Sequence, residues 1–348
     1  MAPRHLLVGN PTAQSGKNKA RIDRALQLLQ SAGIPAELLP TLPGGKTVGA
    51  VRDALTAGAF EVVIAMGGDG TFREVAAGLC ESGARDRIAL GMLPTGTAND
   101  QGKSFGLEAS EEALARNVDV IRAAHETRLD AGRIRGLSPG APAEPEWFFD
   151  SAGWGLSARV LQQRNKDRAF VETLGPLKEI YRDHAVYTGA FLKTFLESYV
   201  VDDKLRASCV LDGRAVELDG LTDLVVKNTR VYAGAWVLDR TARHDDGAFE
   251  LVPFRGKRDW ASKAILDLAG NPIAESPLHD ALGEMGMEHS RPLRASCMEI
   301  ELFAPADVGL SEVGLAAQID GEEWRPYDKV RIDVEARALR LLVPEPSP

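Results

Sequence analysis

Two glycine-rich turns hold the residues whose types and spacing are best suited to chemistry. Residues 67–71 (GGDGT) follow one short apolar run, and residues 94–100 (PTGTAND) follow the next. Glycine lets the backbone approach a ligand closely, and the N–H groups and dipole at a helix N-terminus attract anions. Two such turns, one strand apart at one edge of a parallel sheet, predict a site for the phosphate chain of a nucleotide.

Asp69 is the acidic residue of the first turn. A carboxylate beside phosphate is unfavourable unless a cation lies between them, so its functional interpretation is a contact to Mg²⁺ or its waters, or to a nucleotide hydroxyl. The alternative is a tight turn in which Asp69 hydrogen-bonds its own backbone. The second turn favours the nucleotide interpretation, because Gly96, Thr97 and Asn99 again place a small residue, a hydroxyl and an amide at a strand end.

Two further carboxylates stand far along the chain, at Asp320 and Glu322 in the sequence Asp-Gly-Glu. Phosphoryl transfer to an alcohol needs the hydroxyl held in line with the γ-phosphate and a base that accepts its proton. A carboxylate on a turn between two domains could act as that base. The alternative is a plain hairpin, because Asp-Gly is the strongest short hairpin signal. Asp212-Gly213 lacks the glutamate and is interpreted as a hairpin.

Strands and helices alternate over the first third of the chain and must position these residues. Strands are predicted at 4–9, 36–39, 61–66 and 88–93, and the segments between them carry apolar residues at helical spacing. Units of this length imply right-handed crossovers and a parallel sheet covered on both faces. We therefore predict a Rossmann-like, three-layer α/β/α domain over residues 1–128.

The pattern changes near residue 129, where proline and glycine become frequent and short alternating strands take over. This spacing is typical of an antiparallel β-sandwich, which we predict for residues 129–329 with a helical insertion at 161–201. The strand-like segment at 330–348 is expected to return to the first domain, so the fold class is α/β plus all-β. The candidate strands lie at 147–149, 207–211, 224–226, 249–252 and 297–303, and a short helix is predicted at 260–268.

Composition excludes several classes of protein. The 348 residues carry a net charge of −9, which argues against nucleic acid as the main partner. Cys80, Cys209 and Cys297 are far apart and suggest neither a disulfide framework nor a zinc site, so we expect a reducing cytoplasm. No apolar run approaches the roughly 20 residues that span a bilayer. A local basic patch could still act at a membrane surface within a Debye length of about 8–10 Å.

The two turns together resemble the diacylglycerol kinase catalytic domain, which bacterial soluble lipid kinases share with sphingosine and ceramide kinases. The resemblance includes Asn10-Pro11, Thr41 and Asp320-Gly321-Glu322, and it covers nearly the whole chain. It implies ATP and Mg²⁺ as cofactors, with Glu322 as the base, Asp320 supporting or sharing that role, and Asp69 as a third catalytic residue. The nucleotide-binding residues that it implies are Asn10, Thr41, Gly67, Gly68, Asp69, Gly70, Thr71, Phe72, Arg73, Gly96, Thr97 and Asn99.

Two elements depart from the family pattern. The family has an Asn-Pro-x-Ser-Gly loop, whereas here Ser15-Gly16 comes later, so this loop carries two extra residues. The family also has a Phe-x-Asn-x-x-Gly-x-Gly element, and here Asp150 stands where the asparagine is expected. We assign Asp150 no catalytic role.

Residues 243–248 (RHDDGA) resemble a loop of bacterial members in which two backbone carbonyls and one aspartate hold Mg²⁺. The resemblance assigns these roles to Arg243, Asp246 and Ala248, at spacing i, i+3 and i+5. Hard cations favour such oxygen ligands, and the ion would order the loop. The alternative is an ordinary turn, because Asp-Asp-Gly is a common turn sequence.

A lipid kinase must take an amphiphile from a membrane surface, and two segments are candidates for that contact. Residues 161–201 combine Arg164, Lys166 and Arg168 with an aromatic stripe, and residues 254–260 (FRGKRDW) form a second basic and aromatic cluster. Basic residues beside an aromatic face suit an interfacial helix. The alternative is that the aromatic residues pack on the sandwich while the charges face water.

The resemblance predicts an ATP-dependent kinase that phosphorylates the primary hydroxyl of diacylglycerol to give phosphatidic acid. Ceramide or a sphingoid base is the alternative acceptor, since each also offers a primary hydroxyl. An NAD kinase-like enzyme has a related fold but lacks the second turn, and a non-catalytic binding protein would have no need of Asp69, Asp320 and Glu322 together. We expect a lipid substrate, peripheral contact with the inner membrane surface and no nucleic acid, and we allow for a homodimer.

Overall fold

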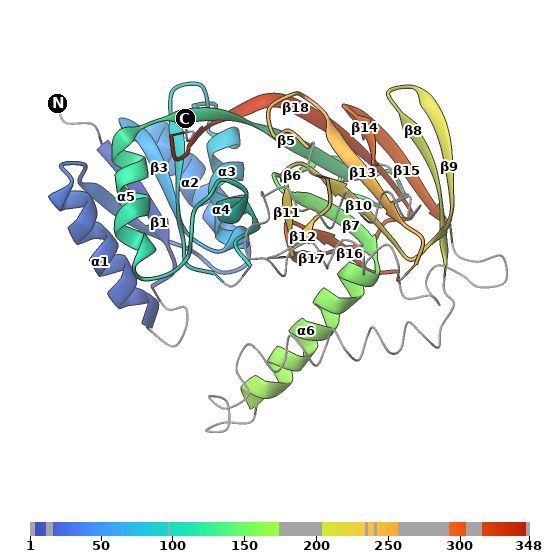
Figure 1. Cartoon of the computed structure of the whole chain (residues 1–348), viewed down its shortest axis with the longest axis horizontal. Coiled ribbons are helices and arrows are strands. Elements are labelled where there is room, and N and C mark those ends of the chain that lie inside the picture. Colours follow the sequence, from blue (N-terminus) through green and yellow to red (C-terminus); the bar gives the residue numbers. More distant parts are fainter. Residues whose placement is uncertain are drawn as a thin grey trace, which may run out of the picture.

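The computed structural model describes residues 4–11, 17–96, 98–173, 204–233, 236–239, 242–256, 292–303 and 315–345. These residues build two large sheets and one small, two-stranded sheet. The N-terminal strands and their helices lie at one end of the molecule and the mostly antiparallel strands at the other (Figure 1). The strand β18 (Lys329–Leu342) runs from one region into the other.

The N-terminal region is a parallel sheet with helices on both faces. Its strands, in spatial order, are β2 (Ala36–Pro40), β1 (Arg4–Gly9), β3 (Phe60–Gly67) and β4 (Ala89–Pro94). Successive strand residues point to opposite faces and so supply two cores. Leu7 and Ile64 pack under α1 (Lys17–Ser31) and α5 (Ala113–Ala123), whereas Val8 and Val63 pack under α2 (Lys46–Ala57) and α3 (Asp69–Glu81).

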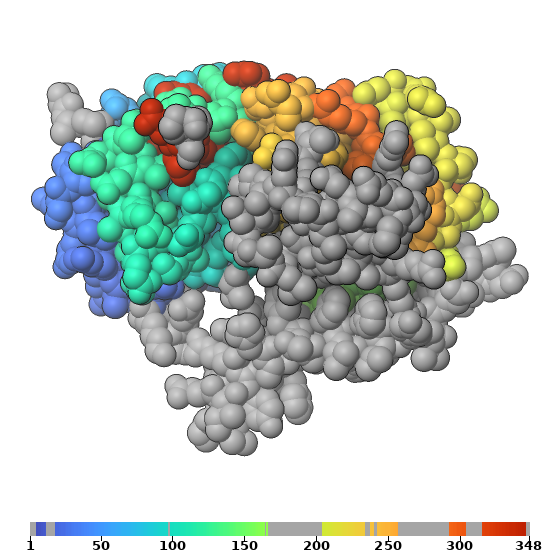
Figure 2. Space-filling model, in the orientation of Figure 1, coloured from blue at the N-terminus to red at the C-terminus, as the bar shows by residue number. Residues whose placement is uncertain are grey.

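The first sheet continues beyond β4 into the C-terminal region. β18 pairs with β4 in parallel and with β5 (Glu126–Gly136) and β15 (Cys297–Phe303) in antiparallel orientation. β8 (Leu205–Leu211) and β9 (Arg214–Leu221) follow β15, and β6 (Glu146–Phe148) pairs with β5. At the surface, red C-terminal residues lie against green and teal residues from the interior of the sequence (Figure 2). One continuous sheet therefore links the two regions.

The second sheet is antiparallel and packs on the far part of the first. Its strands, in spatial order, are β14 (Leu293–Ala295), β13 (Phe249–Phe254), β10 (Asp223–Lys227), β7 (Ser151–Gly155), β16 (Ala317–Ile319) and β17 (Glu322–Trp324). Trp154 and Phe249 from this sheet pack with Met298, Ile300 and Ile332 from the first. The two sheets thus form an antiparallel sandwich around one core.

Three smaller elements complete the described chain. α4 (Asp100–Ser104) begins directly after the second glycine-rich turn, and β11 (Val231–Tyr232) pairs with β12 (Trp236–Val237). α6 (Leu156–Thr173) continues from β7 and extends away from both sheets (Figure 1). Among the helices that the structure describes, none combines the length and the hydrophobicity that crossing a membrane requires.

The predicted fold class, an α/β region plus an antiparallel sandwich, is confirmed. Each strand predicted in the first 94 residues forms, and the five candidate strands in the second region correspond to β6, β8, β10, β13 and β15. The domain limits stay a prediction, and the boundary set at residue 128 falls inside β5. The predicted helix at 260–268 and residues 174–201 of the helical insertion lie outside the described residues.

Candidate active site

The two glycine-rich turns lie in contact at the carboxyl ends of β3 and β4. These strands are parallel neighbours, with Gly67 opposite Pro94, and the N–H of Thr95 donates a hydrogen bond of 2.8 Å to the carbonyl of Gly67. A Cβ atom on Gly96 would lie 2.6 Å from the Cα of Gly68. Glycine is therefore required for the close approach of the two turns, and their meeting surface is made of backbone.

The first turn delivers the chain into the N-terminus of α3. Gly68 is the N-cap residue and, as a glycine, provides no side chain to accept a hydrogen bond from the first N–H groups of the helix. Uncapped N–H groups at a helix start carry a partial positive charge and are available to an anion. The backbone at this edge of the sheet therefore fits the phosphate groups of a nucleotide.

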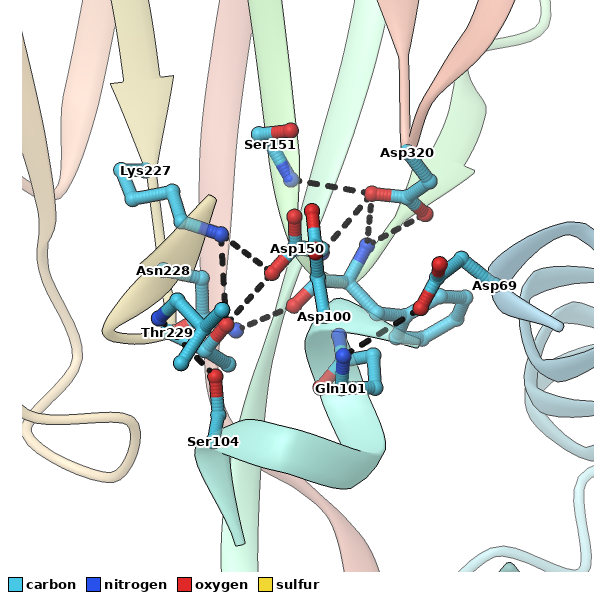
Figure 3. A network of polar contacts seen from close by, with 12 residues as sticks. Asp69, Asp100, Gln101, Ser104, Asp150, Ser151, Lys227, Asn228, Thr229 and Asp320 are labelled. Atoms are coloured by element: carbon cyan, nitrogen blue, oxygen red, sulfur yellow. Dashed lines mark hydrogen bonds and ion pairs between the residues drawn. The ribbon is translucent and has the colours of Figure 1, made fainter. Parts of the chain in front are cut away.

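Asp69 turns toward the second turn rather than toward its own backbone. Its carboxylate accepts a hydrogen bond of 3.2 Å from the N–H of Gln101, at the start of α4 (Figure 3). Burial and the nearby Asp150 raise the pKa of Asp69 to about 6, while the Gln101 bond and Lys227 act in the opposite direction. The hydrogen bond makes Asp69 a link between the two turns.

The side chain of Asn99 stabilises the second turn through hydrogen bonds to the backbone of that turn. Its backbone is left-handed, with φ 53°, and its side chain accepts a hydrogen bond from the N–H of Gly96 (2.9 Å) and donates one to the Gly96 carbonyl (2.5 Å). Asparagine tolerates this backbone conformation better than most residues. Thr97, the other polar residue predicted here, lies outside the described residues.

Glu322 reaches the first turn from the opposite sheet. It is the first residue of β17, and Asp320 and Gly321 form the turn before it with left-handed φ values of 47° and 75°. A Cβ atom on Gly70 would collide with the Glu322 carboxylate, so the bare glycine makes room for that group. The Asp-Gly pair therefore forms a hairpin that also carries an exposed carboxylate to the start of α3.

Asp320 is buried and fully engaged by backbone groups. Its carboxylate accepts hydrogen bonds from three consecutive N–H groups, those of Phe149 (2.9 Å), Asp150 (2.8 Å) and Ser151 (3.0 Å). Burial raises its pKa to about 6. This arrangement suits a residue that holds the Glu322 turn in place rather than one that exchanges protons with substrate.

Residues 4–134, which contain both glycine-rich turns, match the family model described as the diacylglycerol kinase catalytic domain. The chain is accordingly a lipid kinase.

Relatives of similar length accompany this match. The diacylglycerol kinase of Staphylococcus aureus (strain bovine RF122 / ET3-1) is 26% identical over 328 residues, which cover 88% of this chain and 94% of that protein. The diacylglycerol kinase of Staphylococcus saprophyticus is 29% identical over 254 residues, covering 72% of this chain and 73% of that protein.

Solved structures share the fold of this lipid kinase. The crystal structure of a diacylglycerol kinase from Bacillus anthracis str. Sterne superposes with a TM-score of 0.65 at 18% identity, covering 98% of this chain and 97% of that one. Yeast NADH kinase, complexed with NADH, gives a TM-score of 0.50 at 9% identity, covering 99% of this chain and 84% of that one. At these identities the likeness concerns the fold alone.

The remaining nucleotide-site residues predicted for the kinase lie in two kinds of place. Asn10 follows β1, and the N–H of Thr41 donates a hydrogen bond to the Gly9 carbonyl, so both stand at the carboxyl edge of the sheet.

Phe72 is buried against the ring of Phe149, in the core. Arg73 donates to the Trp147 carbonyl and pairs with Glu146 of β6. The side chains of Phe72 and Arg73 thus attach α3 to its neighbours, and neither is free to serve the nucleotide in this arrangement.

The loop predicted to hold Mg²⁺ is held by protein groups. The Asp246 carboxylate pairs with Arg294 and accepts from the N–H of Ala248, while Asp130 accepts from the N–H of Gly247 at 2.7 Å. The part of the chain that the structure describes contains no cluster of three His, Cys, Asp or Glu residues able to bind a metal ion. Arg294 would compete with an ion for the Asp246 carboxylate. The assignment of Mg²⁺ to Arg243, Asp246 and Ala248 stays a prediction, and we assign no step of the reaction to this loop.

We therefore expect the melting temperature of the nucleotide-free enzyme to be the same in EDTA and in millimolar MgCl₂. A native state that does not bind the ion gains nothing from it, whereas an ion at one hundred times its Kd would add about 2.7 kcal/mol to the free energy of unfolding. Scanning calorimetry measures the difference. A saturable rise with Mg²⁺ that disappears in Asp246→Ala would support the metal interpretation of the loop.

Sequence reasoning missed one buried polar cluster beside the site. Lys227, at the end of β10, forms an ion pair with Asp150, and Thr229 donates a hydrogen bond of 2.5 Å to the same carboxylate (Figure 3). Both charged side chains are almost fully buried. The aspartate in place of the family's asparagine was a visible signal. Its partner stands 77 positions away, and nothing local identifies it.

Proposed function

We propose that this lipid kinase transfers the γ-phosphate of Mg-ATP to the primary hydroxyl of diacylglycerol, giving phosphatidic acid and ADP. The observation that carries the proposal is the position of Glu322, whose carboxylate lies against Gly70 in the first turn of α3. A base on the second sheet thereby lies close to a proposed phosphate-binding turn of the first sheet. The primary hydroxyl of the lipid would be held between them.

The nucleotide is assigned to the carboxyl edge of the parallel sheet. The N–H groups of the α3 N-terminus and the backbone around Gly68 and Gly96 would cradle the phosphates. Mg²⁺ that arrives with ATP would neutralise part of the phosphate charge. Asn10 and Thr41 stand at the same edge, where the rest of the nucleotide would lie.

The reaction requires that the lipid hydroxyl be held against the γ-phosphate and that one group accept the hydroxyl proton. The hydroxyl oxygen of the lipid forms a bond to the γ-phosphorus while the bond from that phosphorus to the β,γ-bridging oxygen breaks, and ADP leaves with the electron pair. Glu322 accepts the hydroxyl proton, a role that contributes typically 10²- to 10⁴-fold in rate. Asp320 takes no proton and keeps the Glu322 turn in place through its three backbone hydrogen bonds.

Ceramide or a sphingoid base is the second candidate acceptor, since the same geometry accepts any primary hydroxyl presented at this point. We place the enzyme in the cytoplasm, in peripheral contact with the inner membrane surface through residues 161–201 and 254–260. Of these segments, 174–201 and 257–260 lie outside the described residues. A homodimer is compatible with this proposal, which does not require one.

An acceptor panel tests the proposed function. Purified enzyme is supplied with γ-labelled ATP and Mg²⁺ and with vesicles that contain diacylglycerol, ceramide or sphingosine at equal mole fraction, or with NAD in solution. We expect label in phosphatidic acid at a rate at least about tenfold above the other acceptors, because discrimination in kcat/KM follows transition-state fit. Label in ceramide or sphingosine alone would reassign the acceptor, and label in NAD alone would overturn the lipid-kinase proposal.

A further inference from the structure

Residues 149–151 form a junction that binds the Glu322 turn on one side. Three consecutive N–H groups of this segment converge on the Asp320 carboxylate, and the N–H of Asp320 returns a hydrogen bond of 2.8 Å to the Ser151 carbonyl. The ring of Phe149 also packs edge-on against Phe72 of α3, with ring centroids 6.1 Å apart. The segment therefore contacts both the turn that carries Glu322 and the helix that Glu322 approaches.

The other side of the same segment is bound by the end of β10. The Asp150 side chain pairs with Lys227 and accepts from Thr229, and the Asp150 carbonyl accepts from the N–H of Asn228 at 2.9 Å. The Asn228 side chain donates to the Phe149 carbonyl at 2.8 Å. Figure 3 shows Lys227 and Asp320 on opposite sides of Asp150.

We infer that Lys227 and Asp150 are positioning residues for Glu322: the buried pair fixes residues 149–151, which in turn fix the Asp320–Glu322 turn against Gly70. The inference rests on the proposed function, in which Glu322 is the base. Lys227 acts at a distance from the phosphates, because its ammonium group is buried and is engaged by Asp150 and Thr229. The chain of contacts runs from Lys227 to Asp150, Asp320 and Glu322.

The energetics of buried ion pairs support a positioning role. A buried pair stabilises a protein little more than well-packed apolar residues would, because desolvation offsets the attraction of the charges. Removal of one partner, however, leaves an uncompensated buried charge, which is relieved either by moving the segment toward water or by a change in the protonation state of the remaining group. Here such a movement would displace the three N–H groups that hold Asp320. A misplacement of about 1 Å at a catalytic group can cost about 10²-fold in rate.

Three variants test the inference, namely Lys227→Met, Asp150→Asn and the double variant. We expect each single variant to lower kcat at least about tenfold while the KM for ATP and the Kd for ADP stay within about twofold, since no residue of the glycine-rich turns is replaced. The double variant should recover kcat to within about threefold of wild type, because it removes both charges and the introduced asparagine can still accept from Thr229. Met298→Ala, which opens a cavity in the sandwich core, is the control for lost stability and should keep kcat near wild type below its melting temperature.

Two results would overturn the inference. One is a wild-type kcat in both single variants. The other is a loss of ADP affinity in parallel with kcat, with no recovery in the double variant, which would mark a general structural role. Glu322→Gln, assayed alongside, separates this outcome from failure of the proposed function: if Glu322→Gln retains turnover, the base assignment itself fails.

Discussion

Glu322→Gln should lose phosphate transfer to lipid by about 10²- to 10⁴-fold, the usual contribution of a general base, while ADP still binds. Glutamine keeps the size of the side chain that lies against Gly70 but cannot accept a proton from the attacking hydroxyl. The loss should appear in kcat, with the KM for ATP changed little, because the interaction is made in the transition state. Labelled phosphatidic acid measures the rate, and a fluorescent ADP analogue measures binding.

The neighbouring Glu323→Gln is a matched control. Successive residues of a strand point to opposite faces, so Glu323 faces away from Gly70, and its carboxylate accepts from Asn165 of α6 at 2.7 Å. This variant should retain a kcat within about twofold of wild type, since a single surface contact contributes little. Normal turnover in Glu322→Gln would remove Glu322 from the mechanism, whatever the control shows.

Gly70→Ala should separate activity from stability. The added methyl group would occupy the place of the Glu322 carboxylate, which can move away because it is the end of a flexible side chain. Displacement of the base should lower kcat by about 10- to 100-fold, as expected for misplacement by about 1 Å. The free energy of unfolding should stay equal or rise by about 0.5–1 kcal/mol, because alanine favours a helix more than glycine does.

Gly49→Ala in α2 controls for the helix effect. A Cβ atom at this position would contact only the end of Arg52 at 3.6 Å, so the variant should gain similar stability and keep its activity. Thermal melts and the labelled-lipid assay are run on both variants. Wild-type kcat in Gly70→Ala would mean that Glu322 does not act from the position seen against this glycine.

Local signals in the sequence were sufficient to predict the N-terminal region. The spacing of apolar residues such as Ile22, Ala25 and Leu29 is typical of a helix, and these side chains form the face of α1 that is buried against the sheet, as expected. The two Asp-Gly pairs also form the hairpin turns that their sequence predicts. Both Asp212-Gly213 and Asp320-Gly321 have left-handed φ values. The hairpin alternative for Asp320-Gly321 is confirmed, and the catalytic role of this turn stays a proposal that is compatible with it.

Contacts between distant segments could not be predicted in the same way. The pairing of β18 with β5 and β4 makes one sheet of two regions that differ in sequence pattern, so composition alone suggested a boundary where the structure has a strand. The link from Asp69 to Gln101 and the pair of Lys227 with Asp150 join residues that no local period relates. These links depend on how the sheets pack, and they surround the candidate site.

The central claim, that Glu322 faces a γ-phosphate held at the start of α3, is tested most directly by a crystal structure with Mg²⁺ and a non-hydrolysable ATP analogue. We predict the γ-phosphate at the α3 N-terminus, beside the contact between Gly68 and Gly96, with room for one hydroxyl between it and the Glu322 carboxylate. That hydroxyl should lie within hydrogen-bond reach of the carboxylate, about 2.6–3.2 Å, or one water away. A nucleotide bound elsewhere, or a γ-phosphate directed away from Glu322, would contradict the claim.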